Sequence, residues 1–442
     1  MRKTRLIFFV ALALLLVLST TLFGAQAKKQ KSITIFWAEW DPANYLQELC
    51  NMYKEETGNE AKVETTPWSD FQTKTFNEFA AKGDSYDIVV GDSQWLGRGA
   101  TQGHFVDLTK WIKDKGVDKT MAPATITAYA EYPKGGGKYW AVPLEGDACG
   151  WSYRKDKFED PKEKAAFKKK YGYDLKVPET WAQLKDIAEF FTRPKEKFYG
   201  LAIYTQKDYD ALTMGVENVL WAWGADLGDY KTYKVNGVIN TPDGIASLEF
   251  YKQLFKYTPP DWGNAFFPEN NMAITEGLVA MSMNYYAFFP ALVNPQMNKF
   301  AAKMGFFAMP KGPKARVAAL GGQGASIIMY SKKKDAAYAW LEWFVKPENQ
   351  MKWAKLGGYT CDMKTLQSEE FLSMTPYNRS FMETMQMVKD FWAVPEYAEL
   401  LEVCQRRWHE CVIAGTSSAK DSMDGVAKEW EAIFEKAGYY KK

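Results

Sequence analysis

The residues of this chain that could do chemistry are aromatic rings interleaved with carboxylates and amides. The sequence holds 17 Trp but 2 His among its 442 residues. Proton-transfer catalysis most often uses His, whereas aromatic faces with a few hydrogen-bonding groups can hold a polar ligand without altering it. The composition therefore favours a binding protein over an enzyme, although most of the rings are expected to pack in hydrophobic cores.

Aromatic and polar side chains follow three β-type segments near the start of the chain. These segments are 32–37, 61–65 and 87–90, and helical patterns separate them. Such alternation predicts an α/β fold with a largely parallel, doubly wound sheet. Ligands of such sheets bind outside the carboxyl ends of the strands. The candidate ligand contacts in this part are Glu39, Trp40, Asp41, Trp68, Asp92, Gln94 and Trp95.

Helix capping is the alternative role for some of these polar residues. Asp41 precedes a helical pattern with apolar residues on one face, and this pattern ends at Gly58. Asp92 or Ser93 could likewise satisfy the first backbone N–H groups of a following helix. Trp37 alternates into the first strand and is expected in the core.

The middle of the chain contains a second α/β stretch. It begins near Asp147 and includes predicted strands at 199–204 and 304–309 and a helix at about 247–257. The last third is mostly helical. A chain of this length is too large for one hydrophobic core, which predicts two lobes or domains.

Charge and cysteine content exclude other classes of protein. The formal net charge of +2 offers no basic face for nucleic acid. The five cysteines are too sparse for a disulfide framework, so buried free thiols are expected. We expect neither a metal nor another cofactor, because His104 and His409 lack metal-binding spacing.

The N-terminus is typical of a secretory leader. Residues 1–5 are positively charged, 6–18 form an apolar run and Ala25-Gln26-Ala27 fits a cleavage site. The apolar run is shorter than the ~20 residues that span a membrane, although an uncleaved anchor is the alternative. Since Ala25 stands where a lipoprotein would have cysteine, we expect an unlipidated protein exported to the periplasm.

A series of motifs in a fixed order resembles one known family. The chain is similar to family 1 of the extracellular solute-binding proteins of bacterial ABC importers, the sugar-binding group that includes maltose-binding proteins. Each motif alone is weak, but their order over most of the chain is specific. The motifs are YDIVVGD (86–92), GHFVDL (103–108), KYWAVPLE (138–145), SYRKD (152–156), PETW (178–181), EGLVAM (276–281), LGGQG (320–324), KPENQ (346–350) and GGY (357–359).

The resemblance implies the two-lobe periplasmic binding protein fold of type II. In this fold each lobe has a mainly parallel sheet flanked by helices, three segments cross between the lobes, and the ligand binds in the cleft. Hinge closure around the ligand would present the closed form to an ABC permease, and we expect a monomer. The implied divisions are a signal peptide at 1–27, lobe one at 28–143 and 318–365, and lobe two with the hinges at 144–317 and 366–442, with hinge points near 144–146, 315–317 and Leu366.

The resemblance also implies ligand contacts at the first crossing. Glu145 and Asp147 lie there, and carboxylates accept paired hydroxyl donors strongly. A salt bridge across the hinge is the competing interpretation. Gln323 departs from the family, because many relatives carry Trp after the Gly-Gly pair. An amide at this position would replace ring stacking on the ligand with hydrogen bonds to it.

In lobe two the resemblance points to aromatic contacts. Tyr285 and Tyr286 follow a predicted strand at the position where the family faces its sugar. Trp223 is the further candidate, with either Trp221 or Trp223 expected in the core. The other tryptophans have helical spacing and are expected to be core, namely Trp111, Trp181, Trp340, Trp343, Trp353 and Trp430.

The leading hypothesis is capture of a sugar, oligosaccharide or sugar alcohol. Ferric ion bound through Tyr285 and Tyr286 is one alternative, since adjacent tyrosines resemble the phenolate ligands of iron-binding proteins. A non-sugar polar solute is another. An exported glycosidase with two carboxylates is a third, although no catalytic motif anchors such a pair.

Overall fold

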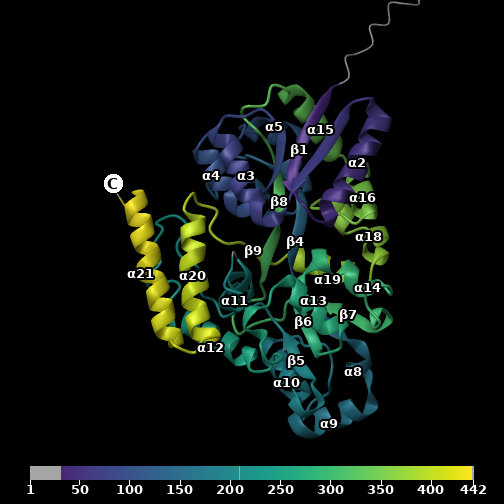
Figure 1. Cartoon of the computed structure of the whole chain (residues 1–442), viewed down its shortest axis with the longest axis vertical. Coiled ribbons are helices and arrows are strands. Elements are labelled where there is room, and N and C mark those ends of the chain that lie inside the picture. Colours follow the sequence, from purple (N-terminus) through teal and green to yellow (C-terminus); the bar gives the residue numbers. More distant parts are fainter. Residues whose placement is uncertain (1–30, 209, 441–442) are drawn as a thin grey trace, which may run out of the picture.

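The computed structural model describes residues 31–208 and 210–440, except for the side chain of residue 69. The leader expected at 1–27 lies outside the described residues. Within the described ranges, no helix is long and apolar enough to cross a membrane. Two groups of strands and helices lie one above the other and are joined through the middle of the molecule (Figure 1).

The strands of the described residues form one continuous sheet. Its order is β2-β1-β3-β8-β4-β6-β5, with β7 paired to β4 and β9 paired to β8. The strands are β1 (Ser32–Ala38), β2 (Glu60–Thr66), β3 (Ile88–Asp92), β4 (Val142–Arg154), β5 (Tyr199–Ala202), β6 (Val279–Tyr285), β7 (Met304–Phe307), β8 (Ala318–Ile327) and β9 (Val388–Lys389).

The sheet is mixed, which corrects the expectation of mainly parallel lobes. Strands β2, β1 and β3 are parallel, as are β5 and β6. Strand β8 runs antiparallel to both β3 and β4, and β4 runs antiparallel to β6 and β7. The reason is that β4 leaves the first lobe and β8 returns to it, so the two strands that join the lobes run in opposite directions.

The predicted helix at 247–257 corresponds to α12, which starts at Pro242. The helices of the described residues surround the strands in both lobes (Figure 1). They are α2 (Asp41–Thr57), α3 (Trp68–Ala80), α4 (Leu96–Thr101), α5 (Thr109–Lys115), α6 (Val117–Thr120), α7 (Pro123–Thr125), α8 (Lys155–Glu159), α9 (Pro161–Tyr171), α10 (Trp181–Phe191), α11 (Ala211–Ala222), α12 (Pro242–Phe255), α13 (Phe267–Thr275), α14 (Pro290–Val293), α15 (Lys334–Phe344), α16 (Pro347–Leu356), α17 (Met363–Leu366), α18 (Glu369–Met374), α19 (Asn378–Met385), α20 (Tyr397–Val412) and α21 (Ala419–Ala437).

Local sequence signals explain where these helices begin and end. Helix α2 starts with Pro42 in its first turn and buries Leu46. It ends at Gly58, whose φ of 71° is a left-handed conformation that glycine adopts without strain. Helix α10 begins with a capping box in which the side chains of Thr180 and Gln183 each accept a backbone N–H of the other residue.

The upper lobe contains β1, β2 and β3 with helices α2 to α5, α15 and α16, and the lower lobe contains β5, β6 and β7 with α8 to α14 (Figure 1). Helices α20 and α21 pack against each other at one side, on α11 and α12. The core of each lobe is rich in aromatic rings. Trp181, Trp340, Trp353 and Trp430 are buried, as is Trp343, whereas Trp111 is half-buried.

Segments from late in the chain return to the upper lobe. The N–H of Gly146 donates to the carbonyl of Tyr359 at 2.6 Å, beside the first crossing strand. Helix α4 approaches the loop before α20 so closely that a Cβ at Gly97 would overlap the carbonyl oxygen of Ala393. The side-chain amide of Gln72 also donates to the hydroxyl of Tyr397.

The cysteines match the sequence-based expectation. Cys50, Cys149, Cys361, Cys404 and Cys411 are all free and buried. Burial raises the pKa of the Cys50 thiol to about 12, which holds it in the unreactive protonated form.

Candidate functional site

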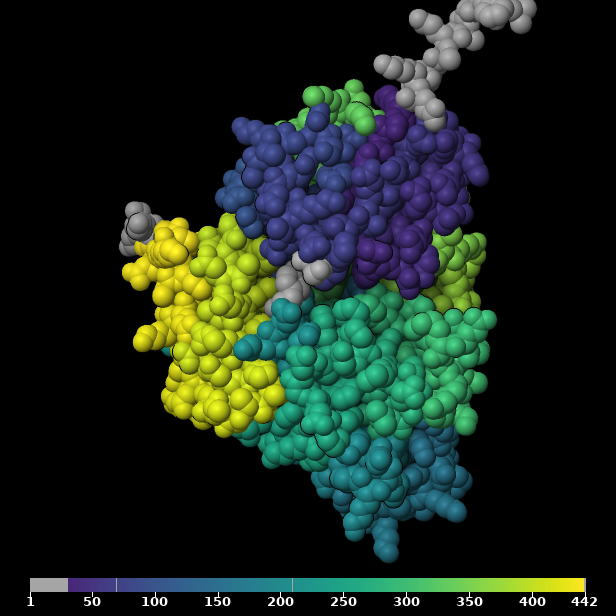
Figure 2. All heavy atoms as spheres, in the orientation of Figure 1, coloured from purple at the N-terminus to yellow at the C-terminus, as the bar shows by residue number. Residues whose placement is uncertain are grey.

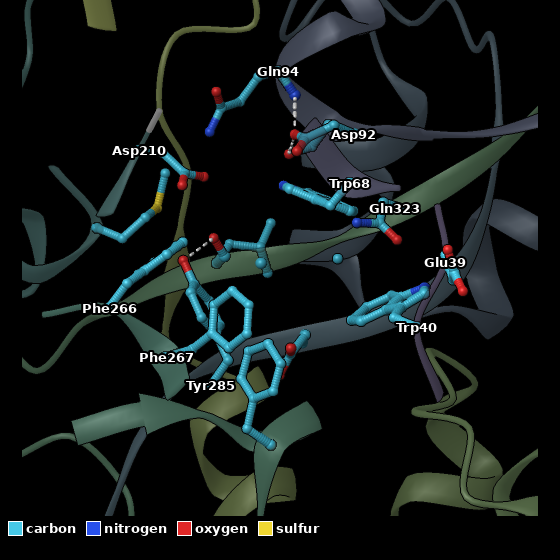
Figure 3. Close-up of a pocket in the computed structure, with 17 residues that line it drawn as sticks. Glu39, Trp40, Trp68, Asp92, Gln94, Asp210, Phe266, Phe267, Tyr285 and Gln323 are labelled. Carbon is cyan, nitrogen blue, oxygen red and sulfur yellow. Dashed lines mark hydrogen bonds between the residues drawn. The ribbon is translucent and has the colours of Figure 1, made fainter. Parts of the chain in front are cut away.

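A cleft of about 210 Å³ lies where the two lobes meet, between the purple and blue upper part and the green lower part of Figure 2. Residues of the upper lobe, the lower lobe and both crossing strands line it. Figure 3 shows aromatic rings on two sides of the cleft and carboxylates and amides between them.

The upper wall comes from the carboxyl ends of the parallel strands. Trp40 follows β1 and precedes α2, Trp68 begins α3 just after β2, and Asp92 ends β3. Because these strands run parallel, their carboxyl ends meet at one edge of the sheet. The rings of Trp40 and Trp68 are 6.0 Å apart and half-buried, so part of each faces the cleft.

Asp92 both faces the cleft and caps the short turn after β3. Its Oδ1 accepts the N–H of Gln94 at 3.0 Å and the hydroxyl of Ser93 at 3.4 Å. This turn holds Gln94 at 2% exposure, and its Oε1 has no hydrogen-bond partner among the described residues. A buried acceptor without a partner costs stability, so a ligand that donates to Gln94 would be favoured.

Gln323 presents its amide to the cleft in a fixed orientation. The indole N–H of Trp37 donates to Gln323 Oε1 at 2.9 Å, inside the core. The NH₂ group of Gln323 is thereby left as the donor toward the cleft. Trp40 Nε1 has no hydrogen-bond partner in the described part of the chain and is a second donor available to a ligand.

The lower wall is aromatic. Phe267, the first residue of α13, stacks on Phe288 with ring centroids 4.3 Å apart, and Phe266 meets Phe267 edge to face at 4.9 Å. The hydroxyl of Tyr285 donates to the carbonyl of Leu320 at 3.4 Å. Gly321 permits this approach, because a Cβ there would stand 2.6 Å from the Tyr285 ring.

Four carboxyl side chains line the cleft: Glu39, Asp92, Asp147 and Asp210. Asp147 is 3% exposed and accepts the N–H groups of its neighbour at 148 and of residue 287. Burial raises the pKa of Asp147 to about 8. Burial, and next the negative charge of Asp92, hold the pKa of Asp210 well above its usual range. None of the described lining residues is Lys, Arg or His.

The structure brings together many of the residues predicted from the sequence. The predicted residues that line the cleft are Glu39, Trp40, Trp68, Asp92, Gln94, Asp147, Tyr285 and Gln323. The predicted residues that do not line it are Asp41, Trp95, Glu145, Trp223 and Tyr286.

Trp95 and Trp223 are directed into packing instead of the cleft. Trp95 is 2% exposed, with its ring 5.0 Å from that of Phe71. Trp223 is half-buried on Phe250, with ring centroids 4.5 Å apart. Its neighbour Trp221 is the buried one of the pair, as expected. Both residues lie at helical turns, where adjacent side chains point in different directions, so neither one faces the cleft as predicted.

Three other predicted residues lie beside the cleft but not on it. Glu145 is fully buried, accepts the N–H of Tyr359 at 3.2 Å and has no ion pair with a described cation. Tyr286 is buried and its hydroxyl bonds that of Thr384 at 3.1 Å. Asp41 is exposed at the start of α2, where its negative charge is favourable to the helix dipole.

Sequence reasoning missed a set of lining residues from the lower lobe and β8, together with Ser93 in the turn after β3. Phe266 and Phe267 were detectable as an aromatic pair before Pro268, at a helix start. Asp210 directly precedes α11, but nothing in the sequence places it opposite β3. The missed residues are Ser93, Asp210, Met214, Phe266, Phe267, Phe288, Leu320, Gly321 and Gly322.

The geometry gives no support to ferric-ion binding. The hydroxyls of Tyr285 and Tyr286 bond different partners, in β8 and in α19 respectively. Burial holds the pKa of both phenols above the usual range, which opposes the phenolate form that iron requires. Among the described residues, no group of three or more His, Cys, Asp or Glu could hold a metal ion.

Comparison with known proteins identifies the family. The model of the bacterial extracellular solute-binding proteins matches residues 38–351, which is most of the chain and includes both crossing strands. The chain belongs to this family.

Solved structures with the same fold include sugar and polyol complexes. This solute-binding protein is similar to maltose-bound T. maritima MalE3 (TM-score 0.76, 23% identity, 91% of this chain and 99% of that one). It is also similar to a solute-binding protein of Agrobacterium radiobacter K84 in complex with ribitol (TM-score 0.74, 23% identity, 91% of this chain and 99% of that one). A third, from Agrobacterium vitis S4 with bound D-mannitol, has a TM-score of 0.69, 20% identity and coverage of 93% and 100%. These likenesses establish the two-lobe periplasmic binding protein fold.

A curated relative is named as a probable amino-acid ABC transporter periplasmic-binding protein, y4oP, from Sinorhizobium fredii. It is 22% identical over 200 residues. The match spans 45% of this chain and 45% of that protein, so less than half of the relative's length is represented.

Proposed function

We propose that this solute-binding protein captures a small sugar or sugar alcohol in the interlobe cleft and delivers it to the permease of an ABC importer. The observation that carries the proposal is the cleft itself, in which aromatic rings from both lobes flank convergent polar groups. The flat apolar faces of a sugar ring suit such rings, and its hydroxyls suit carboxylates and amides.

The size of the cleft favours a small ligand. Its volume of about 210 Å³ lies below the ~300–1,000 Å³ that is usual for pockets of drug-sized ligands. A monosaccharide or a sugar alcohol of similar size therefore fits better than a long oligosaccharide. The replacement of the family's Trp by Gln323 also supports this choice, since one stacking surface is exchanged for a hydrogen-bond donor.

Ligand capture would couple to closure of the lobes. Contacts on both walls are made at once only when the lobes are close, so a ligand would bias the population toward the closed form. We place the hinge at β4 and β8, near 144–146 and 315–317, and beside the third crossing near Leu366. Glycines in β8 at the cleft, such as Gly322 with φ of 100°, allow backbone conformations that other residues resist.

A thermal-shift screen tests the proposal. Purified protein is heated with a panel of pentoses, hexoses, disaccharides, pentitols and hexitols at a concentration of about 100 times the expected Kd. Binding at that level adds about 2.7 kcal/mol to the free energy of unfolding and should raise Tm by roughly 5 °C. If no saccharide or polyol raises Tm, the proposal is wrong.

A free amino acid is the second candidate ligand, because the curated relative is named for amino acids. Recognition of an α-carboxylate usually needs Arg or another strong donor. None of the described residues that line the cleft is Lys or Arg, which disfavours a carboxylate-bearing solute. Including the amino acids in the same screen distinguishes the two ligands.

The expected compartment and partner complete the proposal. A leader at 1–27 would direct the chain to the periplasm as a cleaved, unlipidated monomer. N-terminal sequencing of the exported protein should begin at Lys28. Ligand-loaded protein should stimulate ATP hydrolysis by its permease complex in proteoliposomes, whereas ligand-free protein should not.

A further inference from the structure

We propose that the ligand is a 6-deoxy sugar: a hexose, or the alcohol derived from it, in which a terminal methyl group replaces the CH₂OH group. The methyl group would bind against the lower wall of the cleft, and the remaining hydroxyls would face the upper wall. This inference rests on the proposed function and specifies the class of sugar. It arises from the difference in chemistry between the two walls.

The two walls of the cleft differ in the side chains that can form hydrogen bonds. The upper wall and β8 contribute the carboxyl group of Asp92 and the amide of Gln323, whose NH₂ group is the donor toward the cleft. The lower wall contributes Phe266, Phe267 and Phe288. A phenyl ring carries no donor or acceptor group, so a ligand hydroxyl finds partners on the upper wall that these rings do not provide.

The polar residues of the lower wall lie beside the phenylalanines and do not change this contrast. The hydroxyl of Tyr285 donates to the backbone carbonyl of Leu320. Figure 3 shows Asp210 above the phenylalanines, on the side of Asp92. Met214 and Leu320, which are 1% and 2% exposed, add further apolar atoms to the lining. The surface around the three rings is therefore apolar.

Hydrogen bonds behind the lower wall hold the phenylalanines through their backbone. The side-chain NH₂ group of Asn284 donates to the carbonyl of Phe267 at 3.0 Å, and that of Asn271 donates to the carbonyl of Phe288 at 2.8 Å. Asn284 Nδ2 also donates to Asn271 Oδ1 at 2.8 Å, which joins the two amides. Neither asparagine lines the cleft. Their polar groups position the wall, and the phenyl rings form the surface that a ligand meets.

The rings of the lower wall form a corner. Phe267 and Phe288 are nearly parallel, with an interplanar angle of 2°, whereas Phe266 meets Phe267 at 60°. A single flat ring surface would suit the face of a pyranose. Two surfaces at this angle instead enclose a group that projects from the ligand. The terminal methyl group of a 6-deoxy sugar is a small apolar group of this kind.

A hydroxymethyl group would bind poorly in this corner. Closure of the lobes would remove water from its hydroxyl without supplying a partner, and a buried hydroxyl without a partner is costly. A methyl group in the same place loses no hydrogen bond, and its removal from water is favourable. The lower wall therefore favours a sugar that lacks this one hydroxyl, while the upper wall can bind the others.

Calorimetric titration of matched compounds tests the inference. The 6-deoxy forms of mannose, galactose and glucose and their alditols are compared with the parent hexoses and hexitols, and with the pentoses that lack the sixth carbon. We expect at least one 6-deoxy compound to bind about 10- to 100-fold more tightly than its parent. It should bind about 3- to 5-fold more tightly than the pentose, which has no methyl group.

The outcomes separate this inference from the proposed function. If hexoses or hexitols bind as tightly as their 6-deoxy partners, or if only other saccharides bind, the inference is wrong and the proposed function stands. A pentose that binds as tightly as the 6-deoxyhexose would also overturn the inference, because the methyl group would then make no contact. If no saccharide or polyol binds, the inference and the proposed function are both wrong.

The heat capacity of binding gives a second test on the unaltered protein. Burial of apolar surface on binding makes the heat-capacity change more negative. Titrations at several temperatures should therefore give a more negative heat-capacity change for the 6-deoxy compound than for its parent. Equal values for the two ligands would contradict burial of the methyl group against the lower wall.

A variant and its control localise the effect. Phe266→Ala opens the corner and should reduce the preference for the 6-deoxy compound to less than about threefold, because the methyl group loses its contact. Phe250→Ala removes another half-buried ring of the lower lobe, outside the cleft, and should retain the preference. Circular dichroism and urea denaturation check that both variants fold. An unchanged preference in folded Phe266→Ala would exclude the corner from recognition, and the titrations of the unaltered protein decide the inference if this variant does not fold.

Discussion

The cleft and a second group of charged residues, which we call the lysine cluster, are two places where carboxyl side chains gather, and they differ in the charges around them. In the lysine cluster, Lys134 and Lys389 accompany Asp226, Asp390 and Glu217. In the cleft, the described lining residues include four carboxyl groups and no lysine or arginine. Leu320 contributes to the linings of both the cleft and the cavity beside the lysine cluster, so the two regions are neighbours.

This difference separates a structural role for charge from a binding role. A buried carboxylate that serves the fold needs a permanent partner, because an uncompensated buried charge is strongly destabilising. A carboxyl group that lines a cleft can instead accept hydrogen bonds from a ligand. The contrast predicts opposite consequences when charge is removed from each region.

The largest effect is expected from Lys134→Met, which keeps most of the apolar stem and removes the charge. Asp390 and Glu217 would lose their nearby cation, and the stacking of Lys134 on Tyr230, 5.0 Å away, would also be lost. Removing one partner of a fully buried ion pair costs about 3–5 kcal/mol. Because Lys134 is half-buried and these carboxyl groups act on it through their charge, we expect the free energy of unfolding to fall by about 2–3 kcal/mol in urea denaturation at pH 7.

Lys138→Met is the control for this experiment. Lys138 is exposed and has no ion pair with a described residue, so its removal should change the free energy of unfolding by less than about 0.5 kcal/mol. Equal stability of the Lys134 and Lys138 variants would show that the lysine cluster is not a stabilising unit.

A smaller loss is expected from Trp40→Ala, and it concerns binding. Without its half-buried ring, position 40 would lose its contact with a ligand bound in the cleft. Truncation of a central aromatic contact typically costs about 2 kcal/mol, or about 30-fold in Kd. Titration of the tightest sugar or sugar alcohol measures it, with Trp111→Ala, outside the cleft, as control. An unchanged Kd would show that Trp40 does not contact the ligand.

The smallest effect is expected from Asp210→Asn on the ligand-free protein. Removing one of two repelling carboxylates should leave the free energy of unfolding unchanged or raise it by less than about 1 kcal/mol. Urea denaturation without ligand measures this value. A clear loss of stability would place Asp210 with the carboxylates of the lysine cluster, which serve the fold, and would remove the distinction between the two regions.

The strand-end part of the site could be predicted from the sequence. Residues such as Trp40, Trp68 and Asp92 follow strands whose β-branched pattern is clear, and parallel strands bring their carboxyl ends together. The family resemblance extended this to Asp147 and Tyr285. Both the fold and these positions depend on local patterns and on chain order, which a sequence displays directly.

The remaining part depends on long-range geometry. Asp210 reaches the cleft because α11 packs beside β8, and no local pattern encodes that contact. Trp95 and Trp223 were misplaced because ring type alone does not tell which side of a turn faces the core. The mixed sheet was also missed, since strand direction at the crossings depends on how the lobes connect.

The hydrogen bond from Trp37 to Gln323 has an evolutionary consequence. The bond connects Trp37, a buried residue of β1, to Gln323 of β8, whose NH₂ group is the donor toward the cleft. Any mutation that reverses or removes that donor also leaves a buried indole N–H without its acceptor, so a change of specificity at this position carries a folding penalty. Positions 37 and 323 should therefore vary together among descendants of this protein, and new ligand preferences should arise more readily at Glu39, which is exposed.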